Sequence, residues 1–285
     1  MRVLISALLL TNLLSAQDTE IFLFDLSEVG DQFTLSNPRY LSAFDSNITI
    51  AEPSFADTYQ LLVSSIDKGG QRDIIQLNIF DNSIRQITKT ADQEYSPKHS
   101  PNKQHIACVV YDSLQGNHMI WQYPSDLSSG GNALAKLPQN LREFCFLDKE
   151  WLALYEASSP SSLHLFHPKT GKKQYVSNHV GQCLKKGPEG ETIFIHKHAD
   201  DYWFLKRILP GSRSEIIKKT IPGVDRFTVL ADGSIVMAKG SRIYHLDVKG
   251  DNLWKEIANL ELFGIDNVSD LAFNGINMLA LVVEN

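Results

Sequence analysis

The chain lacks the sequence motifs of common hydrolases and nucleotide-binding enzymes. Its 285 residues contain no G-x-S-x-G elbow, no H-E-x-x-H pair, no Walker loop and no dinucleotide glycine fingerprint. Basic residues are also scarce, with 27 lysines and arginines against 33 aspartates and glutamates, and no basic tract occurs. The net charge of −6 argues against a nucleic acid or an anionic membrane surface as the main partner. We therefore assign no catalytic residue, no metal ligand and no cofactor.

Long apolar runs are absent except within residues 1–16. There, Arg2 precedes the twelve-residue run VLISALLLTNLL, which is too short for a bilayer-spanning helix of about 20 residues. The pattern predicts a secretory signal peptide cleaved between Ala16 and Gln17. Cleavage one or two residues away is an alternative, because Leu14, the third residue before the predicted cleavage site, departs from the usual A-x-A pattern. A buried N-terminal strand is a second alternative. Residues 17–285 are then expected to form one periplasmic or secreted domain without a membrane span.

A repeat of short strands is what the chain does contain. Six hairpin-turn signals recur at intervals of 41 to 46 residues, each followed by a short apolar or alternating run. Asparagine and aspartate tolerate left-handed backbone and glycine adopts it freely, so Asp232-Gly233 and Asn274-Gly275 are strong hairpin signals. Repeats of this length are typical of β-propellers, in which no blade buries both faces alone. The six turns lie at Asp57, Asn102, Asp148, Glu189, Asp232 and Asn274.

Each repeat is interpreted as four strands. Residues 52–89 show the order most plainly, as PSFA, LLVSS, DIIQLNI and IRQIT separated by polar turns. Five blades are complete, whereas the segment after Gln17 supplies only an outer pair and the segment from Val268 to Glu284 only an inner pair. We therefore predict an all-β fold, a six-bladed β-propeller of four-stranded antiparallel blades with one blade shared between the two chain ends. An irregular β-sandwich is the alternative.

The three cysteines and the recurring aromatic residues are assigned to packing. Cys108, Cys145 and Cys183 lie in or at the start of predicted inner strands, and buried free thiols are expected, with a bridge between Cys108 and Cys145 as the alternative. Large rings in the predicted third strands are expected to fill the wedge between twisted sheets. These are Phe22, Phe24, Trp121, Tyr123, Phe166, Trp203 and Tyr244.

One segment carries a family resemblance. The sequence EYSPKHSPNKQHIACVV, residues 94–110, resembles the repeat signature of TolB-like propellers, whose blades carry a Ser-Pro-Asp-Gly type turn between the two inner strands. Here Asn102-Lys103 replaces Asp-Gly. Residues 86–124 further resemble exported, stand-alone TolB-like propellers of Bacteroidota-type bacteria, with WD-like repeats. The resemblance implies a fold rather than an activity, because one fold hosts many functions.

A candidate binding site follows from the predicted ring. Loops from the fourth strand of one blade to the inner strand of the next gather at one mouth of the central channel, where propellers usually bind ligands. We expect their arginines to be exposed loop charges whose replacement costs little stability. Mixed charges there suit a polar peptide or a glycan, although charged loops are also simply soluble loops. The predicted site comprises Glu94, Tyr95, Arg142, Glu143, Asp225 and Arg226.

Three functional hypotheses remain open at this point. The leading one is an exported, non-enzymatic binding or scaffold protein of the bacterial cell envelope, a monomer that recognises a protein, peptide or cell-wall component at the channel mouth. The second is a metal-dependent hydrolase of the lactonase or esterase type acting at the central channel. Its candidate acids, Glu52, Glu94, Glu143 and Asp225, do not occupy one equivalent position. The third is a structural module that contacts partners through its rim.

Overall fold

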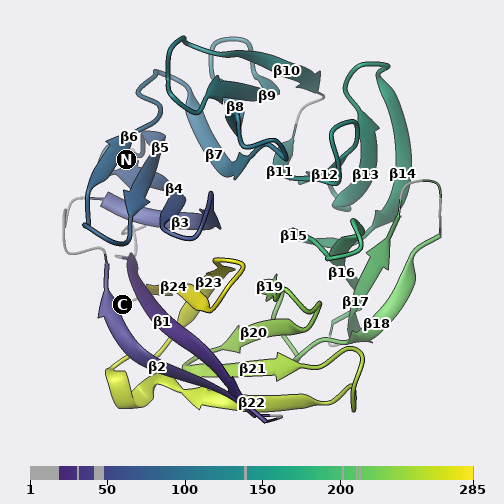
Figure 1. The fold of residues 1–285 in the computed structure, drawn as a ribbon. Coiled ribbons are helices and arrows are strands. Elements are labelled where there is room, and N and C mark those ends of the chain that lie inside the picture. Colours follow the sequence, from purple (N-terminus) through teal and green to yellow (C-terminus); the bar gives the residue numbers. More distant parts are fainter. Residues whose placement is uncertain are drawn as a thin grey trace, which may run out of the picture.

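The structure, a computed structural model, is a ring of six sheets (Figure 1). Each sheet has four antiparallel strands, so the predicted six-bladed fold is confirmed. The predicted leader lies outside the described residues. No helix in the described part of the chain has the length and apolar character that crossing a membrane requires. The structure describes residues 19–30, 32–41, 48–137, 140–200, 202–209, 211 and 213–284.

The blades are numbered along the chain. Blade 1 contains β1 (Thr19–Val29), β2 (Gln32–Tyr40), β23 (Val268–Phe273) and β24 (Met278–Glu284). Blade 2 contains β3 (Ile48–Phe55), β4 (Gln60–Asp67), β5 (Arg72–Asn78) and β6 (Ile84–Gln86). Blade 3 contains β7 (Gln93–His99), β8 (His105–Asp112), β9 (Asn117–Pro124) and β10 (Asn132–Leu137). Blade 4 contains β11 (Leu141–Phe146), β12 (Leu152–Glu156), β13 (Ser162–His167) and β14 (Lys172–Asn178). Blade 5 contains β15 (Val180–Lys186), β16 (Thr192–Ala199), β17 (Tyr202–Ile208) and β18 (Glu215–Lys219). Blade 6 contains β19 (Phe227–Val229), β20 (Ile235–Lys239), β21 (Arg242–Leu246) and β22 (Trp254–Asn259), which the short 3-10 helix η1 (Leu260–Phe263) follows.

Blade 1 joins the two ends of the described chain. Its strand order is β2-β1-β24-β23, so the outer pair comes early in the sequence and the inner pair comes last. Strands β1 and β24 pair antiparallel from Thr19 opposite Glu284 to Asp25 opposite Met278. Backbone hydrogen bonds therefore close the ring, and no sheet edge is left open between its first and last blades.

The inner hairpin turns form where the sequence signals predicted them, and side-chain oxygens explain why. The Asp57 Oδ1 accepts hydrogen bonds from the amides of Tyr59 (2.8 Å) and Gln60 (2.9 Å), the pattern of an Asx turn. In blade 3, Lys103 takes the left-handed conformation (φ 59°) that glycine takes in other blades. The turn of blade 5 differs, because there the carboxylate of Glu191 accepts the amide of Glu189.

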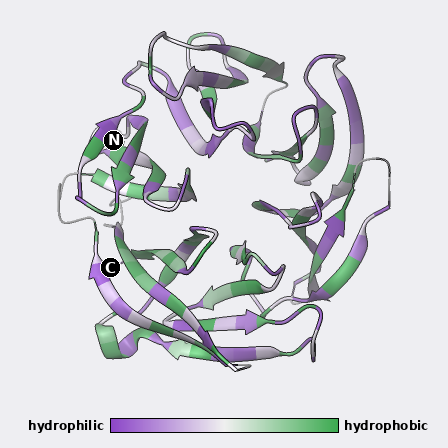
Figure 2. Ribbon diagram, in the orientation of Figure 1, coloured by the Kyte–Doolittle hydropathy of each residue, from purple (hydrophilic) through white to green (hydrophobic). Residues whose placement is uncertain are grey.

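The core consists of six apolar clusters, each shared by two neighbouring blades. The predicted third-strand aromatic residues all lie in or against these clusters, as expected for rings that fill the space between sheets. Outer strands are more polar: β2 is mostly exposed, whereas six of the seven β24 residues are buried (Figure 2). Cys108, Cys145 and Cys183 are buried and free, so the alternative bridge was wrong.

Candidate functional site

A cavity of about 880 Å³ lies at the centre of the ring. All six blades contribute to its wall, through their inner strands or the residues just before them. The side chains that converge on it are Glu52 (β3), Tyr95 (β7), Arg142 (β11), Gln182 (β15), Arg226 (preceding β19) and Asp270 (β23). No two of these residues are close in sequence, so only the closed ring brings them together.

Bulges in the inner strands orient these side chains toward the cavity. In blades 2 and 3 the bulge holds an X-Pro pair, Glu52-Pro53 and Ser96-Pro97, and proline has no amide with which to pair to the next strand. Both residues before proline have left-handed backbone, with φ of 57° at Glu52 and 54° at Ser96. Such strain in a residue other than glycine costs about 1–3 kcal/mol and is common at functional sites. Similar register shifts occur in β11, β15 and β23.

Glu143 is buried in the channel wall with a resident cation. Its Oε1 accepts hydrogen bonds from the Ser96 hydroxyl (2.6 Å) and from the Phe144 amide (3.2 Å), and it forms an ion pair with Lys98 (3.1 Å). Burial lowers the pKa of Lys98, but the surrounding acidic groups, chiefly Glu143, together raise it by more, so the net shift is upward. The ammonium group is therefore charged at neutral pH and neutralises the carboxylate.

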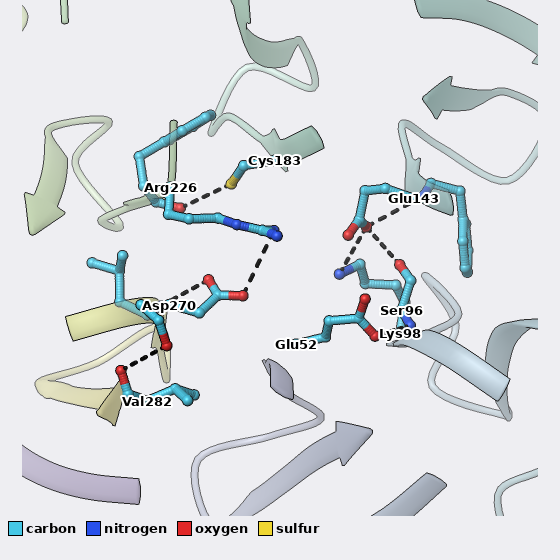
Figure 3. A network of polar contacts seen from close by, with 12 residues as sticks. Glu52, Ser96, Lys98, Glu143, Cys183, Arg226, Asp270 and Val282 are labelled. Atoms are coloured by element: carbon cyan, nitrogen blue, oxygen red, sulfur yellow. Dashed lines mark hydrogen bonds and ion pairs between the residues drawn. The ribbon is translucent and has the colours of Figure 1, made fainter. Parts of the chain in front are cut away.

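Two further channel acids also have cationic partners. Asp270 lies 3.7 Å from the guanidinium of Arg226 (Figure 3), and Glu52 lies 3.6 Å from that of Arg72. Burial raises the pKa of Glu52, and both Arg72 and the hydrogen bond from the Ser96 amide (2.7 Å) oppose that rise. Burial lowers the pKa of Arg226, whereas nearby acidic groups, of which Asp270 is the strongest, together raise it by more, which gives a net increase.

Arg142 differs from these cations. It is exposed to the cavity and forms no ion pair within the part of the chain that the structure describes. Its guanidinium carbon lies 5.2 Å from the centre of the Tyr95 ring, a cation–π distance. Among the described residues, Arg142 is thus a cavity guanidinium with no carboxylate within ion-pair distance.

The structure divides the six predicted site residues into two groups. Tyr95, Arg142 and Arg226 line the cavity, and Glu143 lies beside it next to Ser96. Glu94 and Asp225 are directed elsewhere. The Glu94 carboxylate contacts the hydroxyls of Thr88 and Thr90, and Asp225 pairs with Lys197 of β16 at 2.7 Å.

One expectation about these residues was wrong. Arg226 is not an exposed loop charge, because its side chain is 27% accessible and is paired with Asp270, whose side chain is 12% accessible. Replacing Arg226 would leave a largely buried carboxylate without its partner, which is costly. Arg142 alone fits the expected exposed arginine.

Sequence reasoning missed Arg72, Lys98 and Asp270 as site residues. Arg72 opens β5, a third strand, and reaches the cavity from outside the loops between blades on which the prediction concentrated. A usable signal was present for Lys98: it follows the Ser96-Pro97 pair, and a matching X-Pro pair occurs at Glu52 in the preceding repeat. Repeated X-Pro pairs within predicted inner strands indicate bulges.

The histidine pair on β16 does not belong to this cavity. His196 and His198 share one face of the strand, with ring centres 6.0 Å apart. Among the described residues, no three or more histidine, cysteine, aspartate or glutamate side chains are placed to hold a metal ion.

Glu94 predicts a pH dependence of stability. Burial raises its pKa from 4.5 to about 7, although Thr90 opposes the shift. The folded state therefore keeps a proton that the unfolded state releases, and stability falls as pH rises from about 4.5 to 7. The full shift would correspond to at most about 3 kcal/mol, and we expect about 1–2 kcal/mol because relaxation around a buried charge reduces its penalty. Urea unfolding of Glu94→Gln should show that much extra stability above pH 7 and none near pH 4.5.

The matched control for Glu94 is Glu150→Gln, a change of an exposed turn carboxylate. It should alter the unfolding free energy by less than about 0.5 kcal/mol at either pH. A Glu94→Gln protein with the same pH profile as the parent would contradict the assignment.

The chain matches no family model and no curated protein sequence. Solved structures do resemble it. A protein assigned as TolB from Agrobacterium tumefaciens has a TM-score of 0.70 and 13% identity, over 95% of this chain and 99% of that chain. TolB from Acinetobacter baumannii has a TM-score of 0.57 and 11% identity, over 93% and 63%. A gluconolactonase from Xanthomonas campestris has a TM-score of 0.58 and 10% identity, over 91% and 94%.

These likenesses establish the fold. They join TolB structures and a lactonase in one architecture, and at identities of 10 to 13% they carry no information about activity.

Proposed function

We propose that this protein is a non-enzymatic binding module of the bacterial cell envelope, which recognises a protein, peptide or glycan at the mouth of its central cavity. The observation that carries the proposal is the cavity itself. It holds about 880 Å³, receives side chains from all six blades and contains a guanidinium, that of Arg142, with no ion-pair partner among the described residues. Concave sites with a few convergent polar groups are where proteins bind ligands. The sequence resemblance to exported TolB-like propellers of Bacteroidota-type bacteria supports the envelope location.

The channel acids fit this proposal better than the alternative of a metal-dependent hydrolase. A catalytic divalent ion in an oxygen-lined site needs carboxylates free to coordinate it. Here Glu52, Glu143 and Asp270 each lie within 4 Å of a lysine or arginine of the protein itself. A divalent ion would have to compete with these resident cations, so the donor set does not fit one. We derive no hydrolytic step from it.

Capture of a partner tests the proposal. The domain beginning at Gln17 should retain a specific envelope component, and Arg142→Ala should reduce that capture at least about tenfold, because a bound acidic group loses a charge-assisted hydrogen bond. Arg142→Ala should shift the unfolding free energy by less than about 0.5 kcal/mol, since the side chain is exposed. The control is Arg207→Ala, which removes an exposed arginine on β17.

The outcomes separate the open hypotheses. Failure to retain any specific partner from envelope extracts, across several salt and detergent conditions, would overturn the binding proposal. If capture of the partner is unchanged in Arg142→Ala but is lost when outer-strand residues are substituted, the protein is instead a scaffold that binds partners through its rim.

Export is a separate element of the proposal. We expect protein recovered from its native host to begin at or near Gln17, because Arg2, the apolar run and Ala16 form a secretory signal. Mass spectrometry of the intact protein measures this directly. A cytosolic form that keeps Met1 would rule out an envelope function.

A further inference from the structure

The hydroxyl of Tyr95 is an unexplained polar group in the cavity wall. Tyr95 is only 4% exposed, and its Oη has no hydrogen-bond partner among the described residues. Almost all buried hydroxyls in native proteins are hydrogen-bonded, since leaving one unpaired is costly. Tyr95 lines the cavity, but its hydroxyl oxygen has almost no accessible surface, so a group bound there reaches this hydroxyl only when a neighbouring side chain moves aside.

Two guanidinium groups flank the same ring. The Arg142 carbon lies 5.2 Å from the ring centre and the Arg72 carbon 5.8 Å from it. Arg72 and Arg142 come from different blades, and both line the cavity. Arg72 already shares its charge with Glu52, whereas Arg142 has no carboxylate partner in the described part of the chain. The region around Tyr95 therefore carries an excess of about one positive charge.

The Tyr95 hydroxyl can only donate a hydrogen bond to an anion if it keeps its proton. Burial raises the pKa of Tyr95 to about 12, although Arg142 and Arg72 both lower it. At neutral pH the phenol is thus protonated. A phenol and a guanidinium together offer donors to a group that has acceptors and a negative charge.

We propose that Tyr95, Arg142 and Arg72 form a subsite for a carboxylate group of the bound ligand. The inference rests on the proposed binding function and names the chemical group that the cavity recognises. The phenol and the Arg142 guanidinium donate to the carboxylate oxygens, and Arg72 adds positive charge from its pair with Glu52. A carboxylate fits better than a phosphate dianion, because its single charge matches the unbalanced charge of Arg142 and the Glu52 carboxyl lies close by.

Calorimetric titration with two pairs of peptides tests the subsite on the whole domain. The first pair is acetyl-Gly-Ala-Ala with a free C-terminal carboxylate and the same peptide as its amide. The second is acetyl-Ala-Glu-Ala-amide and its glutamine counterpart. We expect the charged member of one pair to bind at least about tenfold more tightly than its neutral counterpart, and the pair that discriminates identifies a C-terminal or a side-chain carboxylate.

Variants assign the binding to this subsite. Tyr95→Phe and Arg142→Gln should each reduce the affinity for the charged peptide at least about fivefold without changing the affinity for the neutral peptide. Tyr175→Phe, an exposed tyrosine on β14, and Arg207→Ala should leave both affinities unchanged. Thermal melts of all variants verify that they fold.

Three results would overturn the subsite. The first is equal affinity for the charged and the neutral peptides. The second is an affinity for the charged peptide that neither Tyr95→Phe nor Arg142→Gln changes. The third is tighter binding of inorganic phosphate than of either carboxylate peptide. A captured envelope partner whose affinity is unaffected by Tyr95→Phe would also reject the subsite while leaving the binding proposal intact. Absence of any captured partner would reject the binding proposal itself.

Discussion

Removal of residues 277–285 is expected to abolish the cooperative thermal melt. This deletion takes away β24, which pairs with β1 on one side and β23 on the other. Leu279 and Leu281 pack into the cluster between blades 1 and 6, and Ala280 and Val282 pack into the cluster between blades 1 and 2. Large apolar side chains contribute about 1.5–3 kcal/mol each when fully buried. Losing several of them removes most of the free energy of unfolding of a typical domain, which is about 5–15 kcal/mol.

A circular permutant provides the matched control for this deletion. Thr19 pairs directly with Glu284, so a short Gly-Ser linker can join them, and new ends can be placed at the exposed Leu114 in the turn after β8. This chain keeps every strand and should melt within a few degrees of the parent. Circular dichroism at rising temperature measures both proteins. A deletion protein that also melts cooperatively near the parental temperature would show that β24 is not needed to close the ring.

Lys98→Met is expected to lower the free energy of unfolding by about 3 kcal/mol at neutral pH. The substitution leaves the Glu143 carboxylate, whose side chain is 5% accessible, without its cation. Removing one partner of a buried ion pair typically costs about 3–5 kcal/mol, and the hydrogen bond from Ser96 reduces that penalty here. Urea unfolding of the single variant gives this value.

The double variant separates the charge effect from lost packing. Glu143→Gln in the Lys98→Met background removes the buried charge while keeping a hydrogen-bond acceptor for Ser96. It should recover more than half of the lost stability, which a double-mutant cycle reports as a coupling between the two sites. If Lys98→Met unfolds within about 0.5 kcal/mol of the parent, the pair is not a structural element of the channel.

The blades were predictable because their signals are local. The side-chain oxygen of an aspartate or asparagine accepts hydrogen bonds from backbone amides two to four residues later, as in Asp57 and Asn274. The apolar run that follows forms the second strand of the hairpin. The turn of blade 5 shows the limit of this rule, since Glu191 replaces the expected Asx side chain. The register of the repeats nevertheless placed that turn correctly.

The composition of the site was only partly predictable, because it depends on strand register and on distant partners. Glu94 and Tyr95 are neighbours on β7, and only Tyr95 lines the cavity. A single bulge reverses which side chains face the centre, and its position is not set by apolar alternation. The environment of Arg226 depends on Asp270 from the last inner strand, which no local pattern links to it.

The order of strands in blade 1 also determines when the molecule can fold. The first described strand, β1, pairs with the last, β24, so this pairing joins residues that lie very far apart in the sequence, such as Thr19 and Glu284. Such distant contacts form slowly and late. During synthesis, β1 and β2 have no inner strands to pair with until β23 and β24 have been made. If the chain is exported as proposed, this delay keeps it open while it crosses the membrane, and the ring closes only after β24 has emerged.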